Sequence, residues 1–205
     1  LSRMEPLIVE NQGFIDKYIG DAIMALFSEG ADDAVQAGIA MLHSLVEYNQ
    51  YRAASGYAPV KIGVGINTGS LMLGTVGGNN RMDGTVISDA VNLASRIESL
   101  TKSYQVSLLI TQQTFDRLTN PADYAIRKID RVQVKGKSEM VTVYEVFDAD
   151  LPEVKAGKLA TLPVFSEALS VYDMNNFREA TLLFADCLRQ NPGDKVAEIY
   201  LNRCQ

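Results

Sequence analysis

The most informative part of this sequence for its architecture is Phe14-Ile15-Asp16-Lys17-Tyr18-Ile19-Gly20-Asp21-Ala22-Ile23-Met24-Ala25-Leu26-Phe27. Two runs rich in apolar residues, 14–19 and 22–27, are separated there by Gly20 and Asp21. Two short strands joined by a two-residue turn that begins with glycine are typical of a β-hairpin. We therefore expect an antiparallel hairpin with Asp21 at its tip.

Strand and helix patterns continue through residue 148. Two further hairpins are predicted, over residues 60–76 and 131–147, and Gly13 is expected in the left-handed conformation that ends a first helix. A doubly wound parallel sheet would need crossover helices where this chain has tight turns, so the pattern indicates an α+β sandwich over residues 1–148. Helices are expected over 1–12, 32–55, 88–103 and 112–118, a buried strand over 106–110, and a polar loop over 77–84.

The C-terminal part has a different pattern. Residues 149–164 contain Pro152, Gly157 and Pro163, which break regular structure and predict a linker. Residues 165–205 then predict a pair of amphipathic helices and the start of a third, with a spacing of aromatic and small residues that resembles one tetratricopeptide repeat. Because one repeat does not bury its own faces, we expect this helical appendage to pack on the main domain or to lead into a longer array.

Composition and charge exclude several classes of protein. The chain has 205 residues, 47% of them hydrophobic, which suits one domain, or one domain and a small appendage. Its 19 basic and 25 acidic residues give a net charge of −6, which argues against general binding to nucleic acid or to an anionic membrane. Two cysteines are too few for a disulfide framework, and the single histidine leaves almost no material for a His-rich metal site or a Ser-His-Asp triad. No apolar run is long enough to span a membrane, and residues 1–6 are not typical of a signal peptide.

Two charged residues of the first hairpin are candidates for ligand binding. Asp21, at the tip, either accepts backbone N–H bonds of the turn or projects a carboxylate that holds a divalent cation. Lys17 lies four residues earlier, so strand alternation places it on the same face. Its ammonium group either reaches solvent at a sheet edge or pairs with an acceptor on a ligand.

A second set of polar residues lies on a predicted helix and a predicted turn. Asn92 and Arg96 are four residues apart, hence on one helical face, opposite the apolar residues that would form the core. They are either solvated or suited to grip a sugar and a phosphate, because the Arg96 guanidinium keeps its charge. Lys135 and Lys137 flank a turn glycine, where their ammonium groups are either solvated or able to reach a triphosphate.

Taken together, four motifs resemble, in the same order, those of the class III nucleotidyl cyclases. They correspond to that family's metal-binding hairpin, its next hairpin, its transition-state helix and its phosphate turn. The resemblance covers residues 1–148 and implies a ferredoxin-like antiparallel sheet with helices. The four motifs are residues 14–27, Gly63-Val64-Gly65-Ile66-Asn67-Thr68-Gly69, Thr85-Val86-Ile87-Ser88-Asp89-Ala90-Val91-Asn92-Leu93-Ala94-Ser95-Arg96 and Val134-Lys135-Gly136-Lys137.

The resemblance implies a metal site and a base-recognition site. Asp21 would be one of two aspartates that bind a pair of Mg²⁺ or Mn²⁺ ions; the second is expected upstream of Leu1, and Ile15 is not counted as a ligand. Lys17 and Thr85 would read the purine, and Lys17 argues for ATP because guanylyl cyclases carry glutamate at its position. Thr85 also resembles the residue of the bicarbonate-responsive subclass, which implies bicarbonate as a regulator.

The remaining matched residues would act on the ribose and the phosphates. By resemblance, Asn92 orients the ribose, Arg96 stabilises the α-phosphate in the transition state and Lys135 holds the terminal phosphates. In the family, Lys17 and Asp21 act together with the asparagine and the arginine of a second subunit. The resemblance therefore implies a head-to-tail homodimer with two shared sites.

The sequence thus predicts an adenylyl cyclase that converts ATP to 3′,5′-cyclic AMP and pyrophosphate. The alternatives are a guanylyl cyclase, a nucleotide-binding or regulatory module without turnover, and a scaffold dominated by residues 165–205. Because the first residue is Leu1 and not methionine, we expect a larger multidomain signalling protein in the cytoplasm. We expect neither a nucleic-acid partner nor a membrane segment within these residues.

Overall fold

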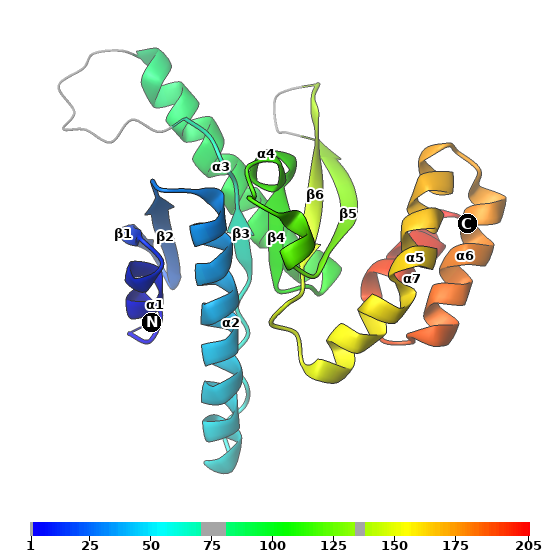
Figure 1. Ribbon diagram of the computed structural model, residues 1–205, viewed down its shortest axis with the longest axis horizontal. Helices are drawn as coiled ribbons and strands as arrows, with labels where there is room; N and C mark the ends of the chain where they lie inside the picture. Colours follow the sequence, from blue (N-terminus) through cyan, green and yellow to red (C-terminus); the bar gives the residue numbers. More distant parts are fainter. Residues whose placement is uncertain (1, 71–80, 134–137) are drawn as a thin grey trace.

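The computed structural model describes residues 2–70, 81–133 and 138–205, with only the backbone described for residues 81–88. Helices and strands are interspersed along the chain up to β6, three helices follow, and the two termini lie toward opposite ends of the molecule (Figure 1). The elements are α1 (Glu5–Glu10), β1 (Gly13–Ile19), β2 (Ala22–Phe27), α2 (Ala31–Ala54), β3 (Val64–Ile66), α3 (Arg81–Tyr104), β4 (Leu108–Thr111), α4 (Gln112–Asp116), a 3-10 turn (Pro121–Asp123), β5 (Ile126–Gln133), β6 (Met140–Val146), α5 (Pro152–Asp173), α6 (Phe177–Gln190) and α7 (Lys195–Arg203).

The strands form two sheets within the described residues. β1 and β2 make an antiparallel two-stranded sheet, and the other four strands are ordered β3-β4-β6-β5. The pairs β4–β6 and β5–β6 are antiparallel, whereas β3 and β4 are parallel because the long helix α3 connects them. The predicted α+β class is confirmed, with one crossover connection that the turn pattern did not reveal.

Helices cover both faces of the four-stranded sheet. On one face, α2 packs Val35, Ile39 and Leu42 against Leu108 and Ile110 of β4. On the other face, the α3 side chains Leu93, Ile97 and Tyr104 pack against sheet residues that include Leu109, Ile129 and Val143. α2 also contacts β2, so it bridges the two sheets. Of the described residues, none forms a helix long and apolar enough to cross a membrane.

Two of the three predicted hairpins are confirmed, and the third lies partly outside the described residues. β1 pairs with β2 from Gly13 opposite Phe27 to Ile19 opposite Ala22, and the turn residue Gly20 has the positive φ of 61° that glycine adopts without strain. β5 and β6 pair around residues 134–137, which are outside the described residues, as is the predicted strand 71–76.

Three local predictions need correction. The predicted strand 60–66 is shortened to β3 at Val64–Ile66, and α3 begins at Arg81, so residues 81–84 of the predicted polar loop are helical. The left-handed residue after α1 is Gln12, with φ of 69°. Gly13 instead starts β1, where the ring of Phe27 occupies the space of a side chain. The close approach of the Phe27 ring on the neighbouring strand, and not helix termination, therefore explains why residue 13 is a glycine.

The predicted linker is helical. Residues 152–163 belong to the 22-residue helix α5, which starts with Pro152 at a position where a missing backbone N–H has no cost. Pro163 lies inside the helix, where proline removes one hydrogen bond at about 3 kcal/mol. Burial of side chains that include Phe165 and Leu169 offsets this cost. Gly157 allows close packing, since a Cβ there would lie 2.8 Å from Oδ1 of Asn191.

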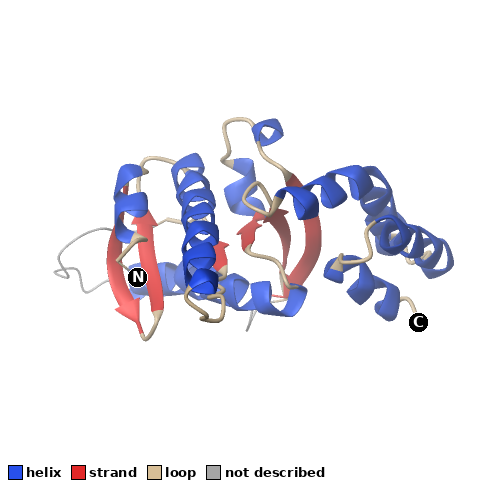
Figure 2. Ribbon diagram, turned by 90° about the horizontal axis from the view of Figure 1, so that it is seen from below, coloured by secondary structure: helices blue, strands red, loops and turns tan. Residues whose placement is uncertain are grey.

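The helices α5–α7 pack on the main domain, as one of the two alternatives predicted. Their buried residues form one continuous core with α3 and the sheet. Within it, the ring of Phe184 stacks on Tyr200 with centroids 5.0 Å apart, and Tyr172 meets Tyr200 edge-on. We refer to α5–α7 as the helical unit; it lies at the end of the molecule opposite the β1–β2 hairpin (Figure 2).

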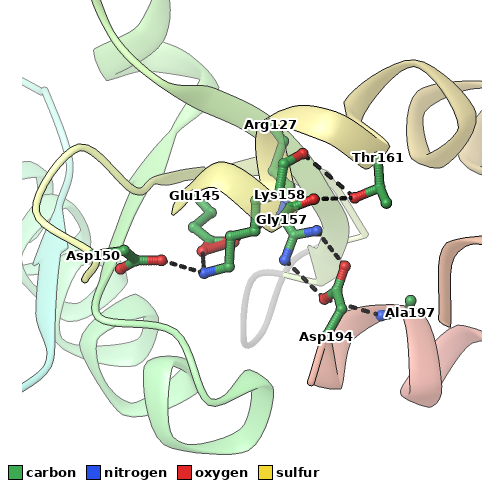
Figure 3. Close-up of polar contacts among 8 residues, drawn as sticks. All are labelled: Arg127, Glu145, Asp150, Gly157, Lys158, Thr161, Asp194 and Ala197. Atoms are coloured by element: carbon green, nitrogen blue, oxygen red, sulfur yellow. Dashed lines mark hydrogen bonds and ion pairs between the residues drawn. The ribbon is translucent and has the colours of Figure 1, made fainter. Parts of the chain in front are cut away.

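A buried chain of five charged side chains joins the helical unit to the sheet (Figure 3). Arg127 of β5 donates to Glu145 of β6 through Nε at 2.9 Å and to Asp194, the N-terminal cap of α7, at 2.7 and 3.0 Å. Lys158 of α5 pairs with the same Glu145 and with Asp150. Signs alternate along the chain, so each buried charge has an opposite neighbour.

The pKa shifts in this chain follow from burial and pairing. Burial opposes ionisation of Arg127, but attraction to Glu145 and Asp194 outweighs it and raises the pKa of the guanidinium. Burial raises the pKa of Asp150, and Lys158 offsets this only in part. Loss of one member of such a chain would leave a neighbouring buried charge without a partner, or with fewer partners.

Candidate active site

The first half of the candidate site is the β1–β2 hairpin. Lys17 lies on β1 and Asp21 in the turn between the strands, and both side chains are exposed. A register irregularity between Ile15 and Lys17 interrupts the strand alternation just before Lys17. Such irregularities re-aim side chains, so the alternation argument from the sequence does not by itself place Lys17 and Asp21 on one face.

The second half is the exposed face of α3. Asn92 and Arg96 are one turn apart on this helix and both are exposed, whereas Leu93 and Ile97 are buried in the core. The predicted division of this helix into a core face and an exposed polar face is therefore confirmed. The core side chains hold the helix in place, and the polar side chains face outward.

Backbone contacts hold α3 directly against β3. A Cβ on Gly65 would lie 2.6 Å from the carbonyl oxygen of Ala94, so only glycine allows the helix to approach this closely. Next to Asn92, the side-chain amide of Asn67 donates to the carbonyl of Ala90 at 3.1 Å and accepts from the Thr111 hydroxyl at 2.8 Å. The polar face of α3 is thus anchored to the end of the sheet.

Two of the predicted site residues are not described by the structure. Thr85 lies in α3, but its side chain is outside the described part, so its role in base recognition and in a bicarbonate response rests on the sequence alone. Lys135 falls between β5 and β6 in the sequence and is also outside the described residues. The partly buried Ile15 has no donor atom on its side chain.

Asp21 is the described residue that the sequence predicts to bind a divalent cation. An exposed carboxylate at the tip of a hairpin is the oxygen donor that Mg²⁺ and Mn²⁺ prefer. No group of three or more acidic, histidine or cysteine side chains that could hold a metal occurs among residues 2–70, 81–133 and 138–205. Asp21 therefore fits as one metal ligand and is not a complete site.

The two halves lie on separate exposed elements of one chain. Apolar side chains surround the hairpin half: Tyr18 and Ile19 on β1 are 51% and 56% exposed. Large exposed apolar side chains next to polar functional groups are typical of surfaces that another protein covers.

Residues 2–146 match the family model of the adenylate and guanylate cyclase catalytic domain, and the chain belongs to this family. The resemblance inferred from the four motifs is thereby confirmed. The fold of residues 2–146, with the β1–β2 hairpin and the polar face of α3, is thus that of a cyclase catalytic domain.

Individual relatives are adenylate cyclases. The chain is 43% identical over 207 residues to the terminal-differentiation specific adenylate cyclase of Dictyostelium discoideum, covering 97% of this chain and 10% of that protein. It is 47% identical over 152 residues to an adenylate cyclase of Anabaena cylindrica, covering 71% of this chain and 30% of that protein. The crystal structure of the adenylyl cyclase CyaB from P. aeruginosa superposes with a TM-score of 0.57 at 32% identity, covering 72% of this chain and 78% of that one.

Proposed function

We propose that this chain catalyses the conversion of ATP to 3′,5′-cyclic AMP and pyrophosphate. The observation that carries the proposal is the presence, within one chain, of Lys17 and Asp21 on an exposed hairpin and of Asn92 and Arg96 on the exposed face of α3. The similarity to adenylate cyclases supports ATP as the substrate, as does Lys17, which can donate to the acceptor nitrogen N1 of adenine.

The chemistry required is an in-line displacement at phosphorus. The ribose 3′-oxygen bonds to the α-phosphorus and loses its proton, while the bond from the α-phosphorus to the β-phosphate oxygen breaks and pyrophosphate leaves. Asn92 would orient the ribose for this attack by hydrogen bonding. Arg96 would stabilise the charge that develops on the α-phosphate oxygens, with a guanidinium that keeps its proton throughout.

Asp21 would bind a divalent cation, Mg²⁺ or Mn²⁺. Such a cation, when bound, neutralises phosphate charge and lowers the pKa of the attacking hydroxyl. Lys135 would hold the terminal phosphates as a point charge.

We further propose that the complete site forms between two copies of the chain, related head to tail. The hairpin half and the helix half are both exposed, and in the hairpin half Tyr18 and Ile19 of β1 are exposed apolar side chains. A symmetric dimer that covers these surfaces would contain two equivalent sites, each with Lys17 and Asp21 from one copy and Asn92 and Arg96 from the other.

The test of this function is cyclic nucleotide formation in a dilution series of the full-length protein, with Mn²⁺ or Mg²⁺ and with ATP or GTP. We expect cyclic AMP as the main product and a specific activity that falls on dilution as the dimer dissociates. Preferential turnover of GTP would contradict the role of Lys17. A folded dimer that forms no product at any concentration would show instead a binding module without catalysis.

Mixing two strongly impaired variants tests the shared site. Asp21→Ala and Arg96→Ala subunits should each be nearly inactive alone, and equimolar mixing should restore activity. Random pairing makes half of the dimers mixed, and each mixed dimer has one intact site of two, so about one quarter of wild-type activity is expected. A mixture of Arg96→Ala with Asn92→Ala subunits is the control, because both changes affect the same half. Absence of recovery in the first mixture, in a dimer of normal stability, would contradict the shared site.

A further inference from the structure

Helix α7 is attached along β5 at three points. Its cap Asp194 pairs with Arg127, the Tyr200 hydroxyl donates to the carbonyl oxygen of Ile129 at 2.7 Å, and Arg203 donates to Oδ2 of Asp130 at 2.8 Å. The start, the middle and the end of the helix thus each contact a residue of one short segment of the strand. The position of α7 relative to β5 is therefore fixed along its length.

The attachment uses an irregularity in β5. The pairing of β5 with β6 shifts between Lys128 and Asp130, which leaves Ile129 as the extra residue of a bulge, with its side chain fully buried. A bulge leaves the extra residue unpaired in the ladder, and an unsatisfied buried carbonyl is costly. Tyr200, itself 2% exposed, provides the missing donor.

Asp130 connects this attachment to α3. The hydroxyl of Tyr104, the last residue of α3, donates to Oδ2 of Asp130 at 2.6 Å, the same oxygen that accepts from Arg203. The backbone N–H of Arg131 donates to the other oxygen at 2.7 Å. Burial opposes ionisation of Asp130, but the bonds from Tyr104 and Arg203 outweigh it and lower the pKa of the carboxyl. One carboxylate therefore joins the ends of α3 and α7 to β5.

The elements joined at Asp130 also carry residues of the proposed cyclase site. Arg96 is eight residues before Tyr104 on the same continuous helix, a distance of about 12 Å along a rigid rod. Its neighbour Ile97 is fully buried in the core that α3 shares with the helical unit. A small tilt of α3 at Tyr104 would consequently move the guanidinium of Arg96.

We propose that Asp130 is a positioning residue of the cyclase: through Tyr104 and Arg203 it couples the docked helical unit to the helix that carries Asn92 and Arg96. This inference rests on the proposed function. It implies that residues 152–205 help to set the geometry of the site and are more than an appended repeat. Asp130 acts through Tyr104 and touches no substrate atom.

Tyr104→Phe tests the link by removing one hydroxyl and leaving the ring in place. The matched control is Tyr124→Phe, because the Tyr124 hydroxyl also donates to an aspartate, Oδ1 of Asp32, at 2.7 Å. Burial and the aspartate raise the pKa of each tyrosine to about 12, so the two bonds are chemically alike. In the full-length protein, Tyr104→Phe should lower kcat on the order of tenfold through misplacement of Arg96, with KM for ATP changed less than about twofold. Tyr124→Phe should leave both constants within about twofold of wild type.

A double-mutant comparison separates positioning from general loosening. In an Arg96→Ala background, Tyr104→Phe should cause a clearly smaller further loss of kcat than in the wild type, because Arg96 is absent and only Asn92 remains to be misplaced. Arg203→Gln should behave like Tyr104→Phe. Fully multiplicative losses with Arg96→Ala, or equal losses in Tyr104→Phe and Tyr124→Phe, would overturn the proposal.

Hydrogen exchange provides a readout that does not depend on turnover. Tyr104→Phe should accelerate exchange of the backbone amides in the last two turns of α3, whereas Tyr124→Phe should not. Unchanged exchange in α3 would overturn the coupling even if kcat fell. A wild-type protein that forms no cyclic nucleotide would contradict the proposed function instead, and the exchange experiment would still decide whether Asp130 holds α3.

Discussion

Arg96→Ala should lower the rate of cyclic AMP formation by about 100–1000-fold while ATP affinity changes little. The guanidinium would contact the α-phosphate most strongly when charge accumulates on its oxygens, so its loss raises the barrier and leaves the ground state nearly unchanged. Arg96 is exposed on α3, and its removal leaves the buried neighbours Leu93 and Ile97 in place. The fold should therefore tolerate the change.

The measurement is kcat and KM with ATP, together with direct nucleotide binding. Lys102→Ala is the control, because Lys102 is an exposed cation in the last turn of the same helix and has no predicted contact with substrate. An equal loss of ATP affinity in Arg96→Ala would identify Arg96 as a ground-state ligand. An unchanged kcat would remove it from the mechanism.

Arg127→Ala should reduce the free energy of unfolding by about 3–5 kcal/mol. The substitution leaves Asp194 without its cationic partner and Glu145 with Lys158 alone, and the side chains of both carboxylates are 1% exposed. It also removes the guanidinium from its position over the ring of Phe165, 4.5 Å from the ring centroid. The cost arises chiefly from the unpaired buried charge of Asp194, and an apolar replacement of the entire chain of five would avoid it.

Urea unfolding at neutral pH measures this effect. Arg189→Ala is the matched control, since Arg189 pairs with Asp186 in the same helical unit but is largely exposed, and its loss should cost less than about 1 kcal/mol. The free energy of unfolding of Arg127→Lys should lie between those of the wild type and Arg127→Ala, because lysine keeps the charge but not the bidentate contact with Asp194. Equal stability of Arg127→Ala and Arg189→Ala would show that the buried chain does not hold the helical unit.

The shared core changes how a scaffold role of residues 165–205 can be tested. Deletion of this segment would expose Ile129 and Val143, which are fully buried, and would remove Asp194 from Arg127 and Arg203 from Asp130. Loss of activity after such a deletion would follow from unfolding alone. Single substitutions at Tyr104 and Arg203 avoid this difficulty because they leave the apolar core intact.

Predictions that depend on neighbours in the sequence were the accurate ones. The Gly20-Asp21 turn, the antiparallel pairing of β1 with β2, and the division of α3 between Asn92 and Arg96 on one side and buried residues on the other are all confirmed. Each depends on alternation or helical spacing within about ten residues. The four motifs likewise identified the family, because their order along the chain is a property of sequence.

Predictions failed where packing between distant residues overrides local preference. Pro163 and Gly157 predicted a linker, yet burial of one face of α5 keeps the helix continuous through both. Gly13 was predicted to end a helix, but glycine is required there because the ring of Phe27 occupies the space of a side chain. In both cases a contact with a residue far along the chain or on the opposite strand supplies more free energy than the local signal.

The sequence by itself determined the family and the hairpin and supplied the candidate residues for action on ATP, because short motifs and their spacing encode them. Only the tertiary structure decided that residues 152–205 share a core with the cyclase fold, and that Arg127, Glu145, Lys158, Asp150 and Asp194 form one chain. Arg127 and Asp194 are hydrogen-bonded although they are 67 residues apart in the sequence. No periodicity relates such positions, and burial makes each charge depend on a partner that only the folded chain brings near.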